Sequence, residues 1–263
     1  MKPVLAPFAV ENEYRIEMDA LIRAMAQDIH REVMAIYRPW LEMQRAAIVG
    51  DASVVDLLVG AFNKLRSKWG RRATPIAEQR ASAFVSKVND TVSISFTRML
   101  RSVSVDPKDV PKANRLQGKA MEVTLDAAVA ENVALIKSIP TEYIDSVQRD
   151  VLLAVQGGWP LGQLSDMLKK RYGITRRRAE LIARDQCAKV TGRMNQQRSL
   201  AAGFTEADWW HSAGSRYPRK LHMQANGKRF KLAEGCEIGG EHILCGQKIN
   251  CKCFFTVVVP GRS

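Results

Sequence analysis

The sequence predicts an α+β fold, with a mostly helical N-terminal region followed by a small α+β C-terminal module. Apolar residues recur at helical spacing through the first two-thirds of the chain, as in amphipathic helices. After Gly203 the pattern changes to short aromatic and β-branched runs between turn residues, which favours strands. The 263 residues, 46% of them hydrophobic, suffice to bury a core. We divide the chain into a helical region, residues 1–173, and a module, residues 174–263.

The helical region is predicted to contain several helices of moderate length. Pro39 should kink or divide the first helix because proline lacks an N–H. Ser53 carries an N-cap signal for the second, which is expected to end before Gly70. The predicted helices cover approximately residues 12–48, 53–69, 74–101, 112–138, 140–156, 161–172 and 175–202.

The later helices are bounded by the same kinds of signal. Pro75 and Pro140 are placed at helix starts, where proline is favoured. Gly158, in a Gly-Gly pair, suits a left-handed helix stop. Gly173 is expected to end a short helix, and Thr175 to cap the basic helix that follows.

The module is predicted to contain short strands and turns. Residues 204–213 form the first predicted strand, and its two adjacent tryptophans would point to opposite faces, so at least one should lie in the core. Residues 219–224 are expected to form one or two helical turns, and Asn226-Gly227 is a tight-turn signal. Residues 254–259, aromatic and β-branched throughout, are the clearest strand.

Positive charge is concentrated in one stretch of the chain. The net charge is +13, and residues 169–198 contain ten basic residues against only Glu180 and Asp185. This field favours nucleic acid or an acidic protein surface as partner, the alternative being a solvated helix face. Contact with nucleic acid would be sequence-independent and would weaken steeply with salt. The candidate contact residues are Arg176, Arg177, Arg178, Arg184, Lys189 and Arg193.

The five cysteines bear on redox state and on metal binding. The chain start lacks the pattern of a secretory signal, and no apolar run reaches the roughly 20 residues of a transmembrane helix, so we expect reduced thiols in a cytosol. Cys187 stands alone, whereas the others gather near the C-terminus. A structural zinc site is one interpretation and buried structural thiols are the other. The candidate ligands are His222, Cys236, Cys245, Cys251 and Cys253, with His211 and His242 further back.

Cys251 and Cys253 set a geometric condition for such a site. Residues two apart in a regular strand share a face, but their Cβ atoms lie about 7 Å apart. A turn or bulge before Phe254 would bring both thiols together. Zinc would then hold together a module that has only a small core.

Catalytic signatures are weak. The sequence contains no H-E-x-x-H, no G-x-S-x-G, no phosphate-binding glycine-rich loop and no carboxylate cluster with metal spacing. A nucleophilic Cys251 with His222 and Glu241 is the enzymatic alternative, and we rank it below a non-enzymatic function.

A series of short motifs follows in order along the module. They are Arg178-Ala179-Glu180-Leu181-Ile182-Ala183-Arg184-Asp185, Gly192-Arg193, Gly203-Phe204, Trp209-Trp210, Arg219-Lys220-Leu221-His222, Asn226-Gly227-Lys228-Arg229-Phe230 and Asn250-Cys251-Lys252-Cys253. The series resembles the phage Mu F-like minor head protein (phage head morphogenesis) family, in which R-x-x-H, a G-x-x-F turn and N-C-R-C precede a strand. The matching residues are Arg219, His222, Gly227, Phe230, Asn250, Cys251 and Cys253. The C-x-x-C that many members carry is absent from residues 215–218.

The resemblance implies a non-enzymatic minor head protein of the virion, assembled in the host cytoplasm and associated with the portal or the capsid interior. Its expected partners are the portal protein and the major capsid or scaffold protein, with sequence-independent contact to packaged DNA and no membrane. Residues 1–173 would dock on the portal or capsid. Family members act in head assembly and, in some cases, in DNA packaging or ejection. Some relatives carry a toxin-like enzymatic domain after the module, and none is expected here. The alternative function is a basic, zinc-stabilised nucleic-acid-binding module.

Overall fold

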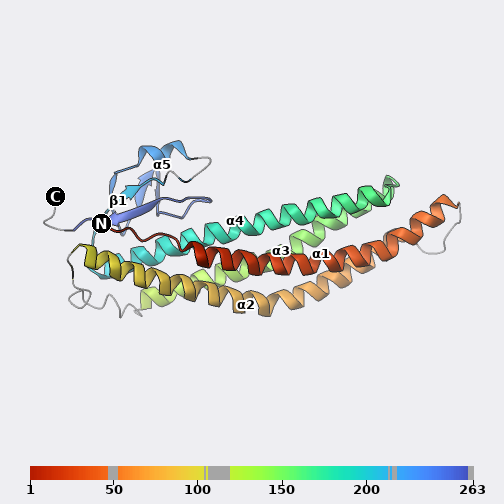
Figure 1. Ribbon diagram of the computed structural model, residues 1–263, viewed down its shortest axis with the longest axis horizontal. Coiled ribbons are helices and arrows are strands. Elements are labelled where there is room, and N and C mark those ends of the chain that lie inside the picture. The colour runs from red at the N-terminus through yellow and green to blue at the C-terminus, as the bar shows by residue number, and fades with distance from the viewer. Residues whose placement is uncertain (47–52, 104, 106–118, 213, 215–217, 260–263) are drawn as a thin grey trace. The chain divides into compact units, whose positions relative to one another are not determined.

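The computed structural model describes residues 1–46, 53–103, 105, 119–212, 214 and 218–259. Its elements are α1 (Phe8–Arg45), α2 (Val54–Ser102), α3 (Lys119–Gln156), α4 (Leu161–Ala201), β1 (Glu206–Trp210), α5 (Lys220–Gln224), β2 (Arg229–Lys231), β3 (Cys236–Ile238), β4 (Glu241–Ile243) and β5 (Phe254–Val257) (Figure 1). The predicted α+β fold, helical first and sheet-containing at the end, is confirmed. Among the described helices, none combines the length and apolar character needed to span a bilayer.

The helices are fewer and longer than predicted. Pro39, Pro75 and Pro140 lie inside α1, α2 and α3, so the breaks predicted at Pro75 and Pro140 are wrong, and Pro39 does not divide its helix. The ends predicted at Gly70 and Gly173 are also wrong, because α2 and α4 continue through them. An interior proline removes one backbone hydrogen bond, and the buried apolar face along each helix offsets that local cost.

Several predicted helix ends are confirmed. The N–H of Asp56 donates to Ser53 Oγ at 3.4 Å, as expected of an N-cap. Gly158 follows α3 with a φ of 58°, and Gly203 follows α4 with a φ of 85°. Thr175 is not a cap, because it lies inside α4 and its hydroxyl donates to a backbone carbonyl one turn earlier. The helix start predicted near residue 112 lies outside the described residues.

The chain forms two compact units. Unit 1 comprises Met1–Tyr14, Ala81–Glu131 and Leu181–Ser263, and unit 2 comprises Arg15–Arg80 and Asn132–Glu180. Each of the helices α1 to α4 therefore contributes a segment to each unit. The docking role of residues 1–173 stays a prediction.

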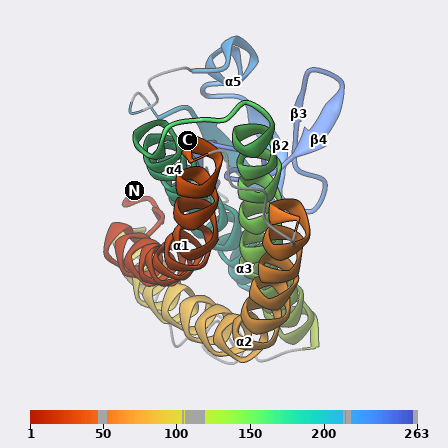
Figure 2. The ribbon, with the colours of Figure 1, turned by 90° about the vertical axis from the view of Figure 1, so that its right-hand side faces the viewer.

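In unit 2 the segments of α1 to α4 lie side by side (Figure 1; Figure 2). The Tyr37 hydroxyl on α1 donates to the carbonyls of Ala154 at 3.1 Å and Trp159 at 2.7 Å, near the end of α3. Asp28 on α1 forms an ion pair with Lys68 on α2. Apolar side chains from all four segments are buried between them: Met18, Ile22, Met25, Ile29, Val33, Leu58, Phe62, Leu65, Ile136, Val147, Val151 and Leu164.

The helical part of unit 1 is built from the remaining segments. The ring of Tyr14 on α1 stacks on Phe84 of α2 with centroids 4.1 Å apart. Arg198 of α4 is buried, and its Nη2 donates to Asn89 Oδ1 at 2.6 Å. Arg198 is part of the basic stretch of residues 169–198, but its side chain is buried inside the unit and does not contribute charge to the surface.

The sheet of unit 1 has the strand order β2-β1-β5, and both pairings are antiparallel. Trp209 of the central strand is fully buried, with its ring 6.3 Å from Phe230, which lies 6.2 Å from Phe255. Trp210 faces the other side, and its Nε1 donates to Thr256 Oγ1 at 2.7 Å. The prediction that at least one tryptophan lies in the core is confirmed.

A loop before β5 lies directly against α4. A Cβ atom on Gly192 would lie 2.0 Å from the carbonyl oxygen of Cys245, and one on Gly246 would lie 2.3 Å from that of Ala188. Gly246 also has a φ of 82°, which glycine adopts without strain. Glycine at both positions therefore allows backbone-to-backbone contact between α4 and this loop.

Candidate metal centre

The register of β1 and β5 brings two potential metal ligands together. Trp210 pairs with Phe254, so continuing the ladder by one residue places His211 opposite Cys253. His211 Nδ1 lies 3.6 Å from Cys253 Sγ. The backbone N–H of His211 donates to Asn226 Oδ1 at 2.8 Å, which holds the end of the strand in place.

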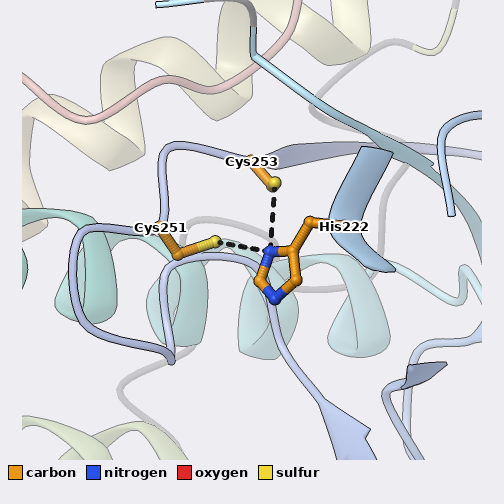
Figure 3. Close-up of side chains that lie close together, drawn as sticks. All are labelled: His222, Cys251 and Cys253. Atoms are coloured by element: carbon orange, nitrogen blue, oxygen red, sulfur yellow. Dashed lines mark hydrogen bonds between the residues drawn. The ribbon is translucent and has the colours of Figure 1, made fainter. Parts of the chain in front are cut away.

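The short helix α5 supplies the central ligand candidate, His222. Its side chain is buried, and its ring meets that of Trp209 edge to face at 5.5 Å. The Nδ1 atom lies 3.6 Å from Cys251 Sγ and 3.6 Å from Cys253 Sγ. Both sulfur atoms point toward this one ring nitrogen (Figure 3).

The two thiols come from an irregular segment that precedes β5. Asn250 has a φ of 59°, and the N–H of Cys251 donates to the carbonyl of Lys248 at 2.9 Å, which closes a turn. Cys253 follows this turn directly before the strand. The turn thus meets the condition set by the sequence: ligand atoms of His222, Cys251 and Cys253 all lie within 4.8 Å of one another.

The two neighbouring thiols titrate as a coupled pair. A hydrogen bond from the Cys253 thiol, with backbone hydrogen bonds at Cys253 and Gly246, outweighs the effect of burial and lowers the pKa of Cys251. The same hydrogen bond and burial raise the pKa of Cys253. Cys251 therefore loses its proton more readily than Cys253 does.

Cys236 and Cys245, also predicted as ligands, are not part of this group among the described residues. Cys236 pairs with Ile243 in the β3–β4 hairpin, and Cys245 lies against Gly192. Burial raises the pKa of both thiols, which keeps them neutral. They match the alternative interpretation of small buried side chains.

The other motif residues surround the same centre. Arg219, before α5, donates to the carbonyl of Ile249 at 2.8 Å and so ties α5 to the segment that carries the thiols. Gly227 has a φ of 79°, and its N–H donates to the carbonyl of Trp209 at 2.7 Å. Phe230 packs below, in the core of the sheet. The motif residues, although spread along the sequence, therefore lie around the group formed by His222, Cys251 and Cys253.

The enzymatic alternative is only partly assembled in the structure, because His222 lies beside Cys251 but the third residue of the set is paired elsewhere. Glu241, drawn as the orienting carboxylate, forms an ion pair with Lys248. A cavity of about 470 Å³ borders Cys251 and Cys253, and its other lining includes Phe8 and Asn195. Cys251 itself is only 3% exposed.

The predicted basic contact residues are not a free cationic surface. Arg177 is exposed, but each of the others forms an ion pair with a glutamate. Lys189 and Arg193 share Glu131, and their positive charges, with a hydrogen bond from Gln186, outweigh burial and hold the pKa of Glu131 below its ordinary value. Contact with nucleic acid stays a prediction. The pairs are Arg176–Glu180, Arg178–Glu142, Arg184–Glu11, Lys189–Glu131 and Arg193–Glu131.

Comparison with known families decides the relationship of this part of the chain. Residues 145–256 match the family described as Phage Mu protein F like protein. Over these residues the chain is similar to the Mu F-like family. The match begins inside α3, before the predicted module start at 174, and it contains His211, His222, Cys251 and Cys253.

A longer relative matches the whole chain. It is a Haemophilus influenzae (strain Rd) protein with the name "Uncharacterized protein", and it is 27% identical over 266 residues. The match covers 100% of this chain and 56% of the relative, so the chain spans little more than half of that protein's length. No solved structure gives a significant match.

Proposed function

We propose that this protein is a phage minor head protein, a structural component of the virion head that takes part in head morphogenesis and docks on the portal protein. The match of residues 145–256 to the Mu F-like family carries the proposal. The assembly of Arg219, His222, Asn250 and the two thiols in one place supports it further. A structural role, and not a catalytic one, accords with that family.

The nucleic-acid alternative has less support than head assembly. The net charge of +13 favours DNA contact. However, glutamates lie within ion-pair distance of most of the candidate side chains, which weakens the local field that phosphates would meet. Contact with packaged DNA is therefore proposed only as an accompaniment to protein docking.

A pull-down of the full chain against the portal protein of the same phage tests the proposal. The experiment is run at low and moderate salt, with and without nuclease. Portal capture that survives nuclease is the expected result, because a direct protein contact does not need DNA. Capture that disappears with nuclease, at both salt concentrations, would refute direct docking and favour the nucleic-acid module.

The composition of purified virions provides an independent test. Mass spectrometry of DNA-filled heads should detect the chain in few copies relative to the major capsid protein. Heads that form and package DNA in normal numbers without this gene, and virions that lack the chain, would contradict a minor head role.

A further inference from the structure

We propose that His211, His222, Cys251 and Cys253 bind one Zn²⁺ ion that holds the C-terminal sheet and α5 together. This site goes beyond the head function and does not depend on it. The donors are two thiols and two imidazoles, a combination typical of tetrahedral structural zinc. Residues with these donors converge from the end of β1, from α5 and from the turn before β5.

The distances between ligand atoms fit a tetrahedral zinc ion. Bond lengths of about 2.3 Å for Zn–S and about 2.0–2.1 Å for Zn–N, separated by a tetrahedral angle, give an S···N separation of about 3.6 Å. His222 Nδ1 lies 3.6 Å from each of the two sulfur atoms. His211 Nδ1 lies 3.6 Å from Cys253 Sγ. The two separations at His222 agree with shared coordination of one metal ion, and the third places His211 beside one of the two thiols.

His211 is assigned as the fourth ligand on grounds of position. It is not among the three residues whose ligand atoms all lie within 4.8 Å of one another, so its ring must turn toward the others. The ring is half-buried and directly follows β1, with its backbone fixed by Asn226. A rotation about the side-chain bonds requires no movement of the strand.

Charge balance also favours a divalent cation here. His222, Cys251 and Cys253 are buried, where an isolated ion would be costly. Two thiolates and one Zn²⁺ sum to zero charge, and neutral imidazoles complete the shell without changing it. A buried neutral zinc cluster therefore avoids an uncompensated charge.

The ion would link segments that are far apart in the sequence. The strands that the ion would link are short, with five residues in β1 and four in β5, so their ladder contributes few hydrogen bonds. Fixing the end of β1, α5 and the start of β5 at one point supplies the order that such short strands lack. Folding of this part of the chain would then be coupled to metal binding.

Metal analysis of the purified full chain, after incubation with Zn²⁺ and removal of excess ion, tests the site. We expect about one Zn²⁺ per chain, and Co²⁺ in its place should show the strong visible absorption of tetrahedral coordination with thiolate charge-transfer bands. Cys251→Ser, Cys253→Ser and His222→Ala should each weaken Zn²⁺ binding by about tenfold or more. No bound metal, or octahedral Co²⁺ without thiolate bands, would overturn the proposal.

Matched variants of the same residue types serve as controls. Cys236→Ser alters a buried thiol of the same part of the chain, and His242→Ala alters a histidine on β4, both outside the ligand group. These variants should retain the metal content and the cobalt spectrum. Equal loss of metal in the controls and in the ligand variants would refute the assigned set. An unchanged Zn²⁺ affinity in His211→Ala would refute His211 as the fourth ligand.

The wild-type chain provides a test that needs no substitution. With Zn²⁺ bound, Cys251 and Cys253 should resist a thiol reagent, and a strong chelator should make both reactive and lower the melting temperature. Cys187 is buried in α4 and serves as the internal reference, since its reactivity should not respond to the chelator. A chelator that changes neither thiol reactivity nor melting would refute a structural zinc ion.

Discussion

Replacing Gly192 with alanine tests the close contact between α4 and the loop before β5. The new Cβ atom would lie 2.0 Å from the carbonyl oxygen of Cys245 and 3.1 Å from its carbonyl carbon. Real contacts of this kind essentially never fall below 3.0 Å, so the loop must retreat by at least about 1 Å. The obstructing group is backbone, which cannot turn aside as a flexible side chain would.

Two opposing effects set the expected magnitude. Alanine favours a helix over glycine by about 1 kcal/mol. Overpacking a well-filled site typically costs about 1–3 kcal/mol, and a rigid backbone contact belongs at the upper end of that range. We therefore expect Gly192→Ala to reduce the free energy of unfolding by about 2 kcal/mol after the helix gain is counted.

Gly70→Ala in α2 is the matched control, because a Cβ atom there would meet nothing within 4 Å. That substitution should stabilise the protein by up to about 1 kcal/mol. Urea denaturation followed by circular dichroism and by tryptophan fluorescence measures both variants. If Gly192→Ala is as stable as Gly70→Ala, the contact between α4 and the loop does not exist as described.

Three further substitutions probe other contacts. Tyr37→Phe removes a hydroxyl that donates to two carbonyls, and it should cost about 1–2 kcal/mol in urea denaturation; full retention of stability would contradict those bonds. Burial pushes the pKa of Asp28 upward, but hydrogen bonds from Lys68 and Arg31 outweigh this effect and hold it below 3.8. The resulting stability is present above the unfolded pKa of 3.8 and is lost as pH falls through the folded pKa. The stability difference between wild type and Asp28→Asn should therefore shrink on acidification below pH 3.8, and a difference that is constant with pH would exclude the ion pairs. Gly227→Ala forces a residue with a side chain into a φ of 79°, which costs about 1–2 kcal/mol. The melting temperature of this variant should fall accordingly, and an unchanged melting temperature would argue against this turn.

The helical content followed from the sequence, but the lengths of the helices did not. Pro75 and Pro140 resemble helix starts, because proline suits the first turn as well as it disfavours the interior. Local preference cannot separate these cases when the apolar face continues on both sides of the residue. Burial along α2 and α3 outweighs the loss of one hydrogen bond, and that burial depends on the partner helices.

The candidate site was predictable where local chemistry determines geometry. The turn that brings Cys251 and Cys253 together was anticipated as a condition, and His222 was among the predicted ligands. Cys236 lies within a hairpin of three-residue strands and Cys245 follows it, and strands this short give no sequence pattern that would set these two thiols apart from the group. The approach of His211 depends on the pairing of β1 with β5, a long-range contact that ligand spacing does not encode.

Each of the helices α1 to α4 contributes to both units, and this limits the use of truncated variants. Deleting α1 removes material from both units, and deleting α4 does the same. A fragment of residues 15–180 would contain all of unit 2, but it would also carry residues 81–131 without the other segments of unit 1, Met1–Tyr14 and Leu181–Ser263. Genetic mapping of head assembly should therefore use point substitutions in the full-length chain, since nested deletions would report misfolding in place of lost partners.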